Sequence, residues 1–236
     1  MRKFDLKQPI HRVGQSVVYY DTLDSMTEKC RSMQGVKGID GTVIFADRIR
    51  TNLGVFDHPC SFGVVLKPET LPFKEKQEVE PVMMGAMASV LEAFQASFRW
   101  PYSFVRDGLV FGLANCLVQK IKDRWVYVIV SVEFDFGETW SEDEQEAFLK
   151  ECLSALDLAD QSMREGNHQG CLDAYRTASN LINRKLKFSL VDREIEGHVQ
   201  EITDQGDLIV KQDSGRKIRV FGKKIKAIQY LDVASK

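Results

Sequence analysis

Two spacings of apolar side chains run along this chain, and each predicts a type of element. Short runs rich in β-branched and aromatic residues predict strands over 13–20, 42–46 and 61–66. Asp21 or Thr22 is placed to cap a helix that continues to Met33. Apolar residues at three- and four-residue intervals then predict one long helix over 78–98.

The second half of the chain also contains both predicted strands and predicted helices. Strands are expected over 102–105, 109–121 and 125–136, and the last is continuously apolar around Val130, as in a central strand buried on both faces. Ser141 and Glu144 have the spacing of a capping box, which predicts a helix from there to about residue 163. Another helix is expected over 171–187. Helices against a mixed β-sheet indicate an α+β layer fold.

The pattern changes near residue 192, where we place a domain boundary. No helical period follows; short segments separated by tight turns predict strands at 197–203, 207–212, 216–221 and 225–231. Short strands of this kind close into a small barrel. We therefore expect an α+β domain over 1–191 and a small β-barrel domain over 192–236.

Composition narrows the function classes. The 236 residues carry a formal net charge of −2, which gives no bulk attraction to nucleic acid. The cysteines, odd in number and without C-x-x-C spacing, fit a reduced cytoplasmic setting, and the histidines show no metal-ligand spacing, so no metal site is expected. No apolar run is long enough to span a membrane, and no leader is apparent.

Four short motifs occur in a fixed order. They are Asp24-Ser25-Met26-Thr27, the strand ending at Ala46-Asp47, Arg99-Trp100-Pro101 and Gly112, and a β-rich tail from Gly197 follows. Together they resemble the biotin-protein ligase and lipoate-protein ligase family, whose members read D-S-T-N, A-E-x-Q-x-x-G-R-G-R, K-W-P-N-D and G-K-K-x-x-G-I. The resemblance implies a mixed sheet with packed helices of the class II synthetase and biotin-ligase type, followed by an SH3-like barrel.

The resemblance also implies a ligand site. Such enzymes join a carboxylic acid to ATP and pass the acyl group to a lysine of a carrier domain. The implied ligands are ATP and biotin or lipoate, neither of them certain, and the implied partner is a small acyl or carboxylate ligand or a biotinyl or lipoyl carrier domain. The matching positions, expected in one cleft, are Ser25, Thr27, Arg48, Arg50, Asn52, Gly54, Arg99, Trp100, Leu109 and Gly112.

The chain departs from the family where the chemistry is done. Leu109 occupies the position of the lysine that contacts the acyl carboxylate and the adenylate phosphate. Asn52 stands on one of the two loop glycines, and Leu53 and Val55 stand on the arginines. Leucine and valine cannot donate to a phosphate, so we assign no catalytic residue.

Simpler interpretations accompany these residues. Ser25 and Thr27 are also ordinary at a helix start, and Arg48 and Arg50 are also ordinary on a surface loop. Cys60 and Cys116 are expected to be inert thiols, not acyl-transfer nucleophiles.

Three hypotheses for the function of the protein follow. The preferred one is a ligase-like protein that binds a small acyl or carboxylate ligand, or a carrier domain, without standard ligase activity. The others are an active divergent ATP-dependent ligase or acyltransferase, and a protein-interaction module.

Overall fold

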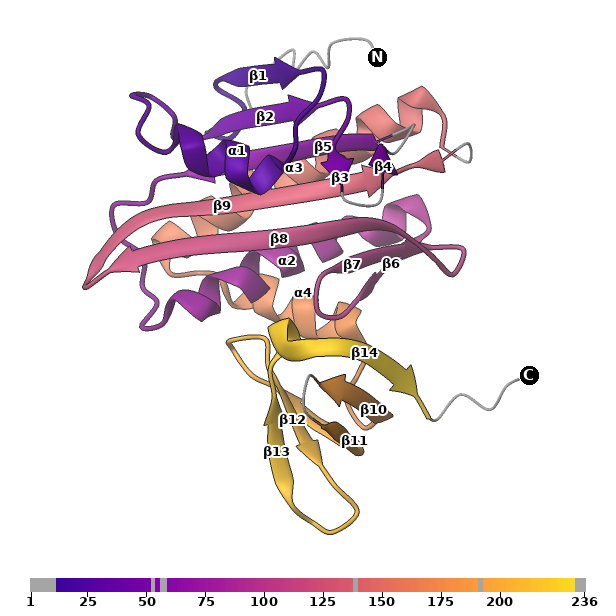
Figure 1. Ribbon diagram of the computed structural model, residues 1–236. Coiled ribbons are helices and arrows are strands. Elements are labelled where there is room, and N and C mark those ends of the chain that lie inside the picture. The colour runs from indigo at the N-terminus through magenta and orange to yellow at the C-terminus, as the bar shows by residue number, and fades with distance from the viewer. Residues whose placement is uncertain (1–11, 52–53, 56–58, 138–139, 191–192, 232–236) are drawn as a thin grey trace.

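A large mixed sheet forms the centre of the molecule (Figure 1). The computed structural model describes residues 12–51, 54–55, 59–137, 140–190 and 193–231. Within these ranges, seven strands lie in the order β1-β2-β5-β9-β8-β7-β6. They are β1 Val17–Tyr20, β2 Thr42–Ala46, β5 Pro59–Leu66, β6 Ala96–Arg99, β7 Ser103–Arg106, β8 Leu109–Ile121 and β9 Arg124–Asp135.

Only the pair β1–β2 is parallel, and the remaining neighbours are antiparallel. The strand β9 lies in the middle, and its residues from Val128 to Val132 are buried, as the continuous apolar run predicts. The α+β class is therefore confirmed.

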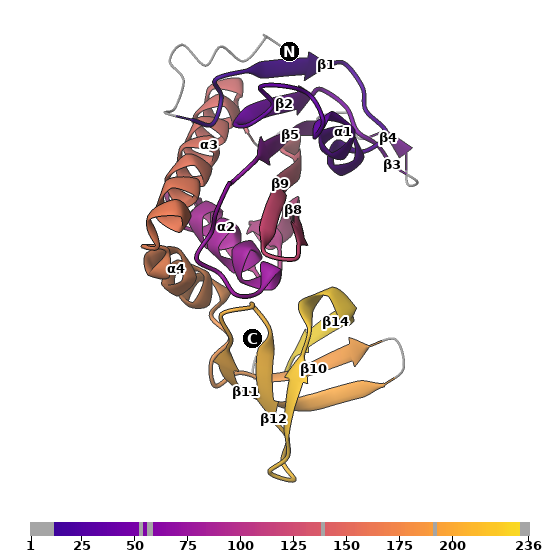
Figure 2. The same ribbon diagram turned by 90° about the vertical axis from the view of Figure 1, so that its left-hand side faces the viewer.

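Helices cover both faces of this sheet unequally (Figure 2). The helix α1, Met26–Met33, lies on one face, and α2, Val79–Ala88, and α3, Glu142–Glu165, lie on the other. The helix α4, Gln169–Ser179, packs against α2. The predicted capping box opens α3, because the Ser141 hydroxyl accepts from the Glu144 amide and the Glu144 side chain accepts from the Ser141 amide. No helix in the described ranges combines the length and apolar character needed to span a bilayer.

Three predicted helices are wrong in extent, the first because Ser25, and not Asp21 or Thr22, caps α1. The segment 78–98 holds a 3-10 turn η1, Lys76–Glu78, then α2, a second 3-10 turn η2, Leu91–Phe94, and the strand β6. The apolar spacing persists across these breaks because Leu91 also enters the core, and the helical course ends at Gln95, whose φ is 55°. The segment 171–187 ends as a helix at Ser179, and Asn180 follows in the left-handed conformation.

A separate five-stranded antiparallel sheet closes the chain, in the order β13-β12-β11-β10-β14. Its elements are β10 Lys185–Leu190, β11 Glu194–Ile202, β12 Leu208–Lys211, β13 Lys217–Val220, the 3-10 turn η4 Gly222–Lys224, and β14 Ile225–Tyr230. We call it the C-terminal sheet. It begins at β10, upstream of the boundary expected at 192, because Leu186 and Phe188 alternate into its core. Residues 191 and 192 themselves lie outside the described ranges.

Candidate functional site

The helix α1 packs directly on the sheet, and this contact defines the site. Ser25 caps it, its hydroxyl accepting from the Glu28 amide at 3.3 Å. Below it, a Cβ placed on Gly63 of β5 would lie 2.3 Å from Cys30 Sγ and 3.1 Å from Met26 Sδ. A glycine at 63 therefore allows α1 to pack directly on the strands. Side chains of its first turn can then reach the sheet.

A chain of three polar side chains joins α1 to the middle of the sheet. Thr27 Oγ1 lies 2.7 Å from Ser131 Oγ of β9, and Asn115 Nδ2 of β8 donates to Thr27 Oγ1 at 3.2 Å. Ser131 is buried, whereas Asn115 is exposed. The chain of hydrogen bonds thus leads from the interior to an open part of this sheet face, which we call the α1 face.

A second polar row lies beside the first. Cross-strand pairing places Ser61 opposite Glu133, and Glu133 opposite Leu113, on the α1 face. Ser61 is 0% exposed, and its Oγ has no hydrogen-bond partner among the described residues. Glu133 is half-buried, and this burial raises the pKa of its carboxyl above the ordinary value of 4.5. No described residue forms an ion pair with it.

Glu133 should make the protein less stable as the pH rises. Its pKa is higher in the folded than in the unfolded chain, so the folded state holds the proton over a window that begins near 4.5 and ends at the raised pKa. Stability falls across that window. We expect Glu133→Gln to remove this dependence. In melting curves recorded from about pH 4 to about pH 7, the melting temperature of the variant relative to that of the parent should therefore increase with pH. Parallel curves for the two proteins would contradict the assigned environment.

The α1 face gathers only part of the predicted site. Thr27 takes part in it and Ser25 stands at its edge as the helix cap. Arg48 is exposed after β2. The following hairpin pairs β3, Arg50–Thr51, with β4, Gly54–Val55. Asn52 and the side chain of Arg50 lie outside the described part of the chain.

Other predicted residues lie elsewhere. Leu109 is 74% exposed at the β7–β8 turn and pairs with Arg106, whose guanidinium stacks over Trp140 on the opposite side of the sheet. Arg99 is exposed on the edge strand β6. It is separated from Glu133 by three strand spacings, about 14 Å. The expected convergence of these residues with Thr27 is not seen.

Two predicted ligand contacts belong to the core. Trp100 is 1% exposed, and its indole N–H donates to the carbonyl of Gly206 at 3.0 Å, so it offers no wall to a ligand. A Cβ on Gly112 would lie 2.6 Å from the ring of Phe134 and 2.9 Å from that of Phe104. Packing of the aromatic core thus accounts for that glycine without a ligand.

The thiol of Cys116 is also a core group. It is buried, and desolvation raises its pKa, so it stays protonated and unreactive. The side chain of Cys60 lies outside the described part of the chain.

The sequence prediction missed Ser61, Asn115, Ser131 and Glu133. A signal was present, because Ser131 and Glu133 interrupt an otherwise apolar strand at alternate positions. Polar side chains at that spacing share one face of a central strand. Which other strands contribute to that face depends on register, which the sequence does not show.

Comparison with solved structures assigns the architecture. The biotin protein ligase of Aquifex aeolicus superposes with a TM-score of 0.65 at 14% identity, covering 92% of this chain and 99% of that one. The protein has the biotin-protein-ligase fold. The same enzyme in complex with biotin and ATP gives a TM-score of 0.66 at 15% identity, over the same shares of the two chains. A biotin-protein-ligase-like protein of unknown function from Silicibacter sp. TM1040 gives 0.59 at 13% identity, over 87% of this chain and 93% of that one.

Sequence comparison gives no such result. No protein-family model matches the chain. No curated protein sequence matches it either. The fold is shared over 92% of this chain at 14% identity with the Aquifex aeolicus enzyme, so most residues differ between the two.

Proposed function

We propose that the protein binds a small acyl or carboxylate ligand on the α1 face and lacks standard ligase activity. The observation that carries this proposal is the Ser61 hydroxyl, which is buried beside a half-buried carboxylate and has no partner among the described residues. An unpaired buried hydroxyl costs about 1–3 kcal/mol, and a bound polar group would remove that cost. The adjacent chain of Thr27, Ser131 and Asn115 extends the polar strip.

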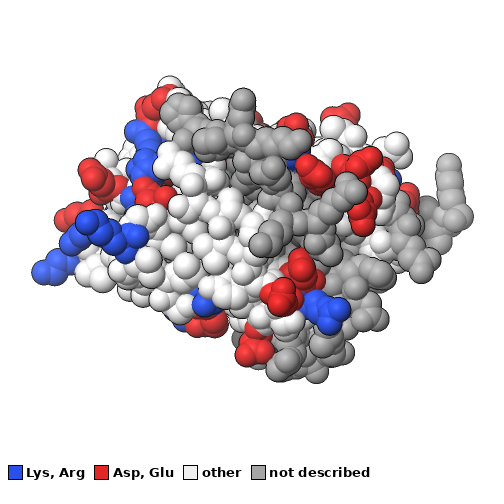
Figure 3. All heavy atoms as spheres, turned by 90° about the horizontal axis from the view of Figure 1, so that it is seen from above, with Lys and Arg blue, Asp and Glu red and all other residues white. Residues whose placement is uncertain are grey.

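The polarity of the α1 face orients the ligand. Glu133 has no cationic partner among the described residues, so it favours an N–H or O–H donor and repels a carboxylate. The uncharged, donor-rich end of the ligand therefore lies against Glu133, and it reaches the Ser61 hydroxyl, which has no exposed surface, only when the side chains over it move aside. Its carboxylate is directed toward the segment of Arg48 and Arg50, which supplies positive charge. Figure 3 views the molecule from above, toward the β1 edge of the sheet and not onto the α1 face, and the described residues there carry charges of both signs.

The absence of adenylation follows from Leu109 and from the segment 99–103. Leu109 is uncharged and belongs to the other side of the sheet, while Tyr102 and Ser103 stand where the family pattern has Asn-Asp. Binding without acyl activation suits a protein that holds a small ligand or receives a biotinyl or lipoyl carrier domain. The C-terminal sheet, which we infer to be an SH3-like barrel, would be the accessory domain of a cytoplasmic protein.

The active-ligase alternative requires Arg48, Arg50 and Arg99 to replace the lost cations. Arg99 lies at the far edge of the sheet from α1, which weighs against that arrangement. The interaction-module alternative concerns the C-terminal sheet alone. It gives no reason for the polar strip formed by Thr27, Ser131 and Asn115 on the α1 face. The α1 face therefore favours ligand binding.

The test measures melting temperature with biotin, lipoate and octanoate, and titration calorimetry with whichever stabilises the protein. A ligand at a hundred times its dissociation constant stabilises the folded state by about 2.7 kcal/mol. Ser61→Ala should raise the stability of the free protein, because an unsatisfied hydroxyl is removed, yet weaken ligand binding about tenfold. Ser214→Ala, in an exposed turn of the C-terminal sheet, is the control and should leave binding unchanged. The proposal fails if no compound stabilises the protein or if both variants bind equally well.

A further inference from the structure

The C-terminal sheet is fixed against the rest of the molecule by close contacts. Lys223 Nζ lies 2.7 Å from Glu80 Oε2 of α2, and the indole of Trp100 donates to the Gly206 carbonyl. A Cβ on Gly206 would lie 2.9 Å from Pro81, and one on Gly222 would lie 2.9 Å from Pro101. Backbone approach of this kind holds the two parts in a defined arrangement.

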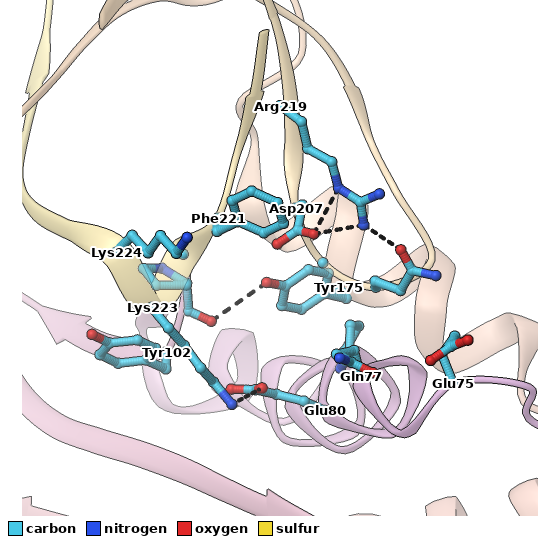
Figure 4. A pocket seen from close by; sticks show the side chains of 15 residues that line it. Glu75, Gln77, Glu80, Tyr102, Tyr175, Asp207, Arg219, Phe221, Lys223 and Lys224 are labelled. Atoms are coloured by element: carbon cyan, nitrogen blue, oxygen red, sulfur yellow. Dashed lines mark hydrogen bonds and ion pairs between the residues drawn. The ribbon is translucent and has the colours of Figure 1, made fainter. Parts of the chain in front are cut away.

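These contacts surround a cavity of about 520 Å³ (Figure 4). We call it the interdomain cavity. Small-molecule sites occupy roughly 300–1,000 Å³ and are frequent where two domains meet. The start of α2 and the turn after β6 form one wall, and residues 205–207 and 219–224 form the other. None of these elements belongs to the α1 face.

The cations of the cavity differ in whether they are already paired. Arg219 is 2.7 Å from the Asp207 carboxylate, and Lys223 is paired with Glu80. Lys224 Nζ lies 5.1 Å from the ring centroid of Phe221 and forms no ion pair with a described carboxylate. The ring holds the ammonium by a cation–π contact. Lys224 is thus the cation that remains available for an anion from outside.

The rest of the lining combines apolar surface with polar side chains, among them Glu75, Gln77 and Gln205. Pro81, Pro101 and the 42%-exposed ring of Phe221 supply apolar wall. Tyr175 is buried and directs its hydroxyl toward the Pro101 carbonyl at 3.5 Å, which is long for a hydrogen bond. Burial, and then the carboxylates of Glu80 and Asp207, raise the pKa of Tyr175. Its hydroxyl therefore stays protonated and can donate to a ligand.

We propose that the interdomain cavity is a second binding site, which takes a small organic anion, a carboxylate or phosphate attached to an apolar ring or chain. Lys224 pairs with the anionic group, and the proline and Phe221 surfaces contact the apolar body. The ligand bridges the C-terminal sheet and α2. This site is separate from the α1 face and functions whether or not that face binds a ligand.

The experiment is an amide NMR titration of the full chain with benzoate, phenyl phosphate, benzamide and benzylamine at millimolar concentrations. Benzoate or phenyl phosphate should shift the amides of Gly206 and Gly222 in a saturable manner and leave Gly63, on the α1 face, unmoved. Benzamide and benzylamine, which have the ring without the negative charge, should bind at least about tenfold more weakly. Equal binding of benzamide, shifts centred on Gly63, or no saturable shift with any probe would overturn the proposal.

Two lysine variants complete the test. Lys224→Gln should weaken binding of the anionic probes about tenfold, because it removes one charge-assisted hydrogen bond. Lys226→Gln removes the same charge from an exposed position of β14 that does not line the cavity, and should leave affinity unchanged. Equal losses in both variants would mean that general surface charge attracts the probes, which would overturn the site.

Discussion

Gly85→Ala should destabilise the protein by about 3 kcal/mol, at the upper end of the cost of overpacking a core. Gly85 lies in α2 where that helix crosses α4, and a Cβ there would be 1.9 Å from the Cys171 carbonyl oxygen and 3.0 Å from the Tyr175 amide nitrogen. Both are backbone atoms, so no side chain can rotate away and the helices must separate. For a chain of this size, we expect the melting temperature to fall by about 6–12 °C.

Gly170→Ala is the matched control. Gly170 lies in the first turn of α4, and a Cβ there has nothing within 4 Å. Alanine is the better helix former by about 1 kcal/mol, so this variant should be unchanged or more stable. Thermal unfolding of the two variants separates a steric effect from one of composition. A Gly85→Ala protein that melts with the parent would show that α2 and α4 are not in the contact described.

The separation of α2 and α4 has a further consequence. Tyr175 of α4 and Glu80 and Pro81 of α2 line the interdomain cavity. Gly85→Ala should therefore weaken anion binding at the cavity in whatever fraction remains folded. Binding at the α1 face, on the other side of the sheet, should be less affected.

Local chemistry made part of the fold predictable. The capping box at Ser141 and Glu144 fixes the start of α3 through hydrogen bonds between residues three apart. The strand 42–46 and the buried run of β9 likewise depend on side chains close in sequence. The predicted helix over 78–98 failed because α2 ends at Ala88 and Gln95 later takes a left-handed conformation, and apolar spacing reports neither break.

The candidate site was less predictable, because the register in which the strands pair decides which side chains lie together. Ser61 and Glu133 are neighbours only through the pairing of β5 with β9, and the local sequence around either residue does not predict that pairing. The burial of Trp100 was not predictable for a related reason, since its hydrogen-bond partner Gly206 lies 106 positions away. The order of the motifs predicted the biotin-protein-ligase fold, because backbone topology tolerates extensive side-chain changes.

Biotin-dependent pyrophosphate exchange by the purified protein should stay at background. Exchange requires the acyl-adenylate to form and to reverse, and a cation must stabilise the charge that develops at the reacting carboxyl and phosphate. Loss of one such group costs about 10²–10³ in rate. Leu109 lacks the charge, and the loop positions 53 and 55 hold leucine and valine where the family pattern has arginine. Losses at several positions together should leave no measurable exchange.

Leu109→Lys tests whether one residue accounts for that loss. We expect no recovery, because position 109 lies at the exposed β7–β8 turn, in register with Arg106 on the side of the sheet opposite α1. A lysine there would meet solvent and the Arg106 guanidinium, which repels it. The variant should fold as the parent does, since the side chain replaced is 74% exposed. The biotin protein ligase of Aquifex aeolicus, assayed in parallel, serves as the positive control. Exchange well above background in the parent protein would contradict the proposed function and support the divergent-ligase hypothesis. Recovery of exchange in the variant alone would show that the β7–β8 turn reaches the α1 face when ligand is bound.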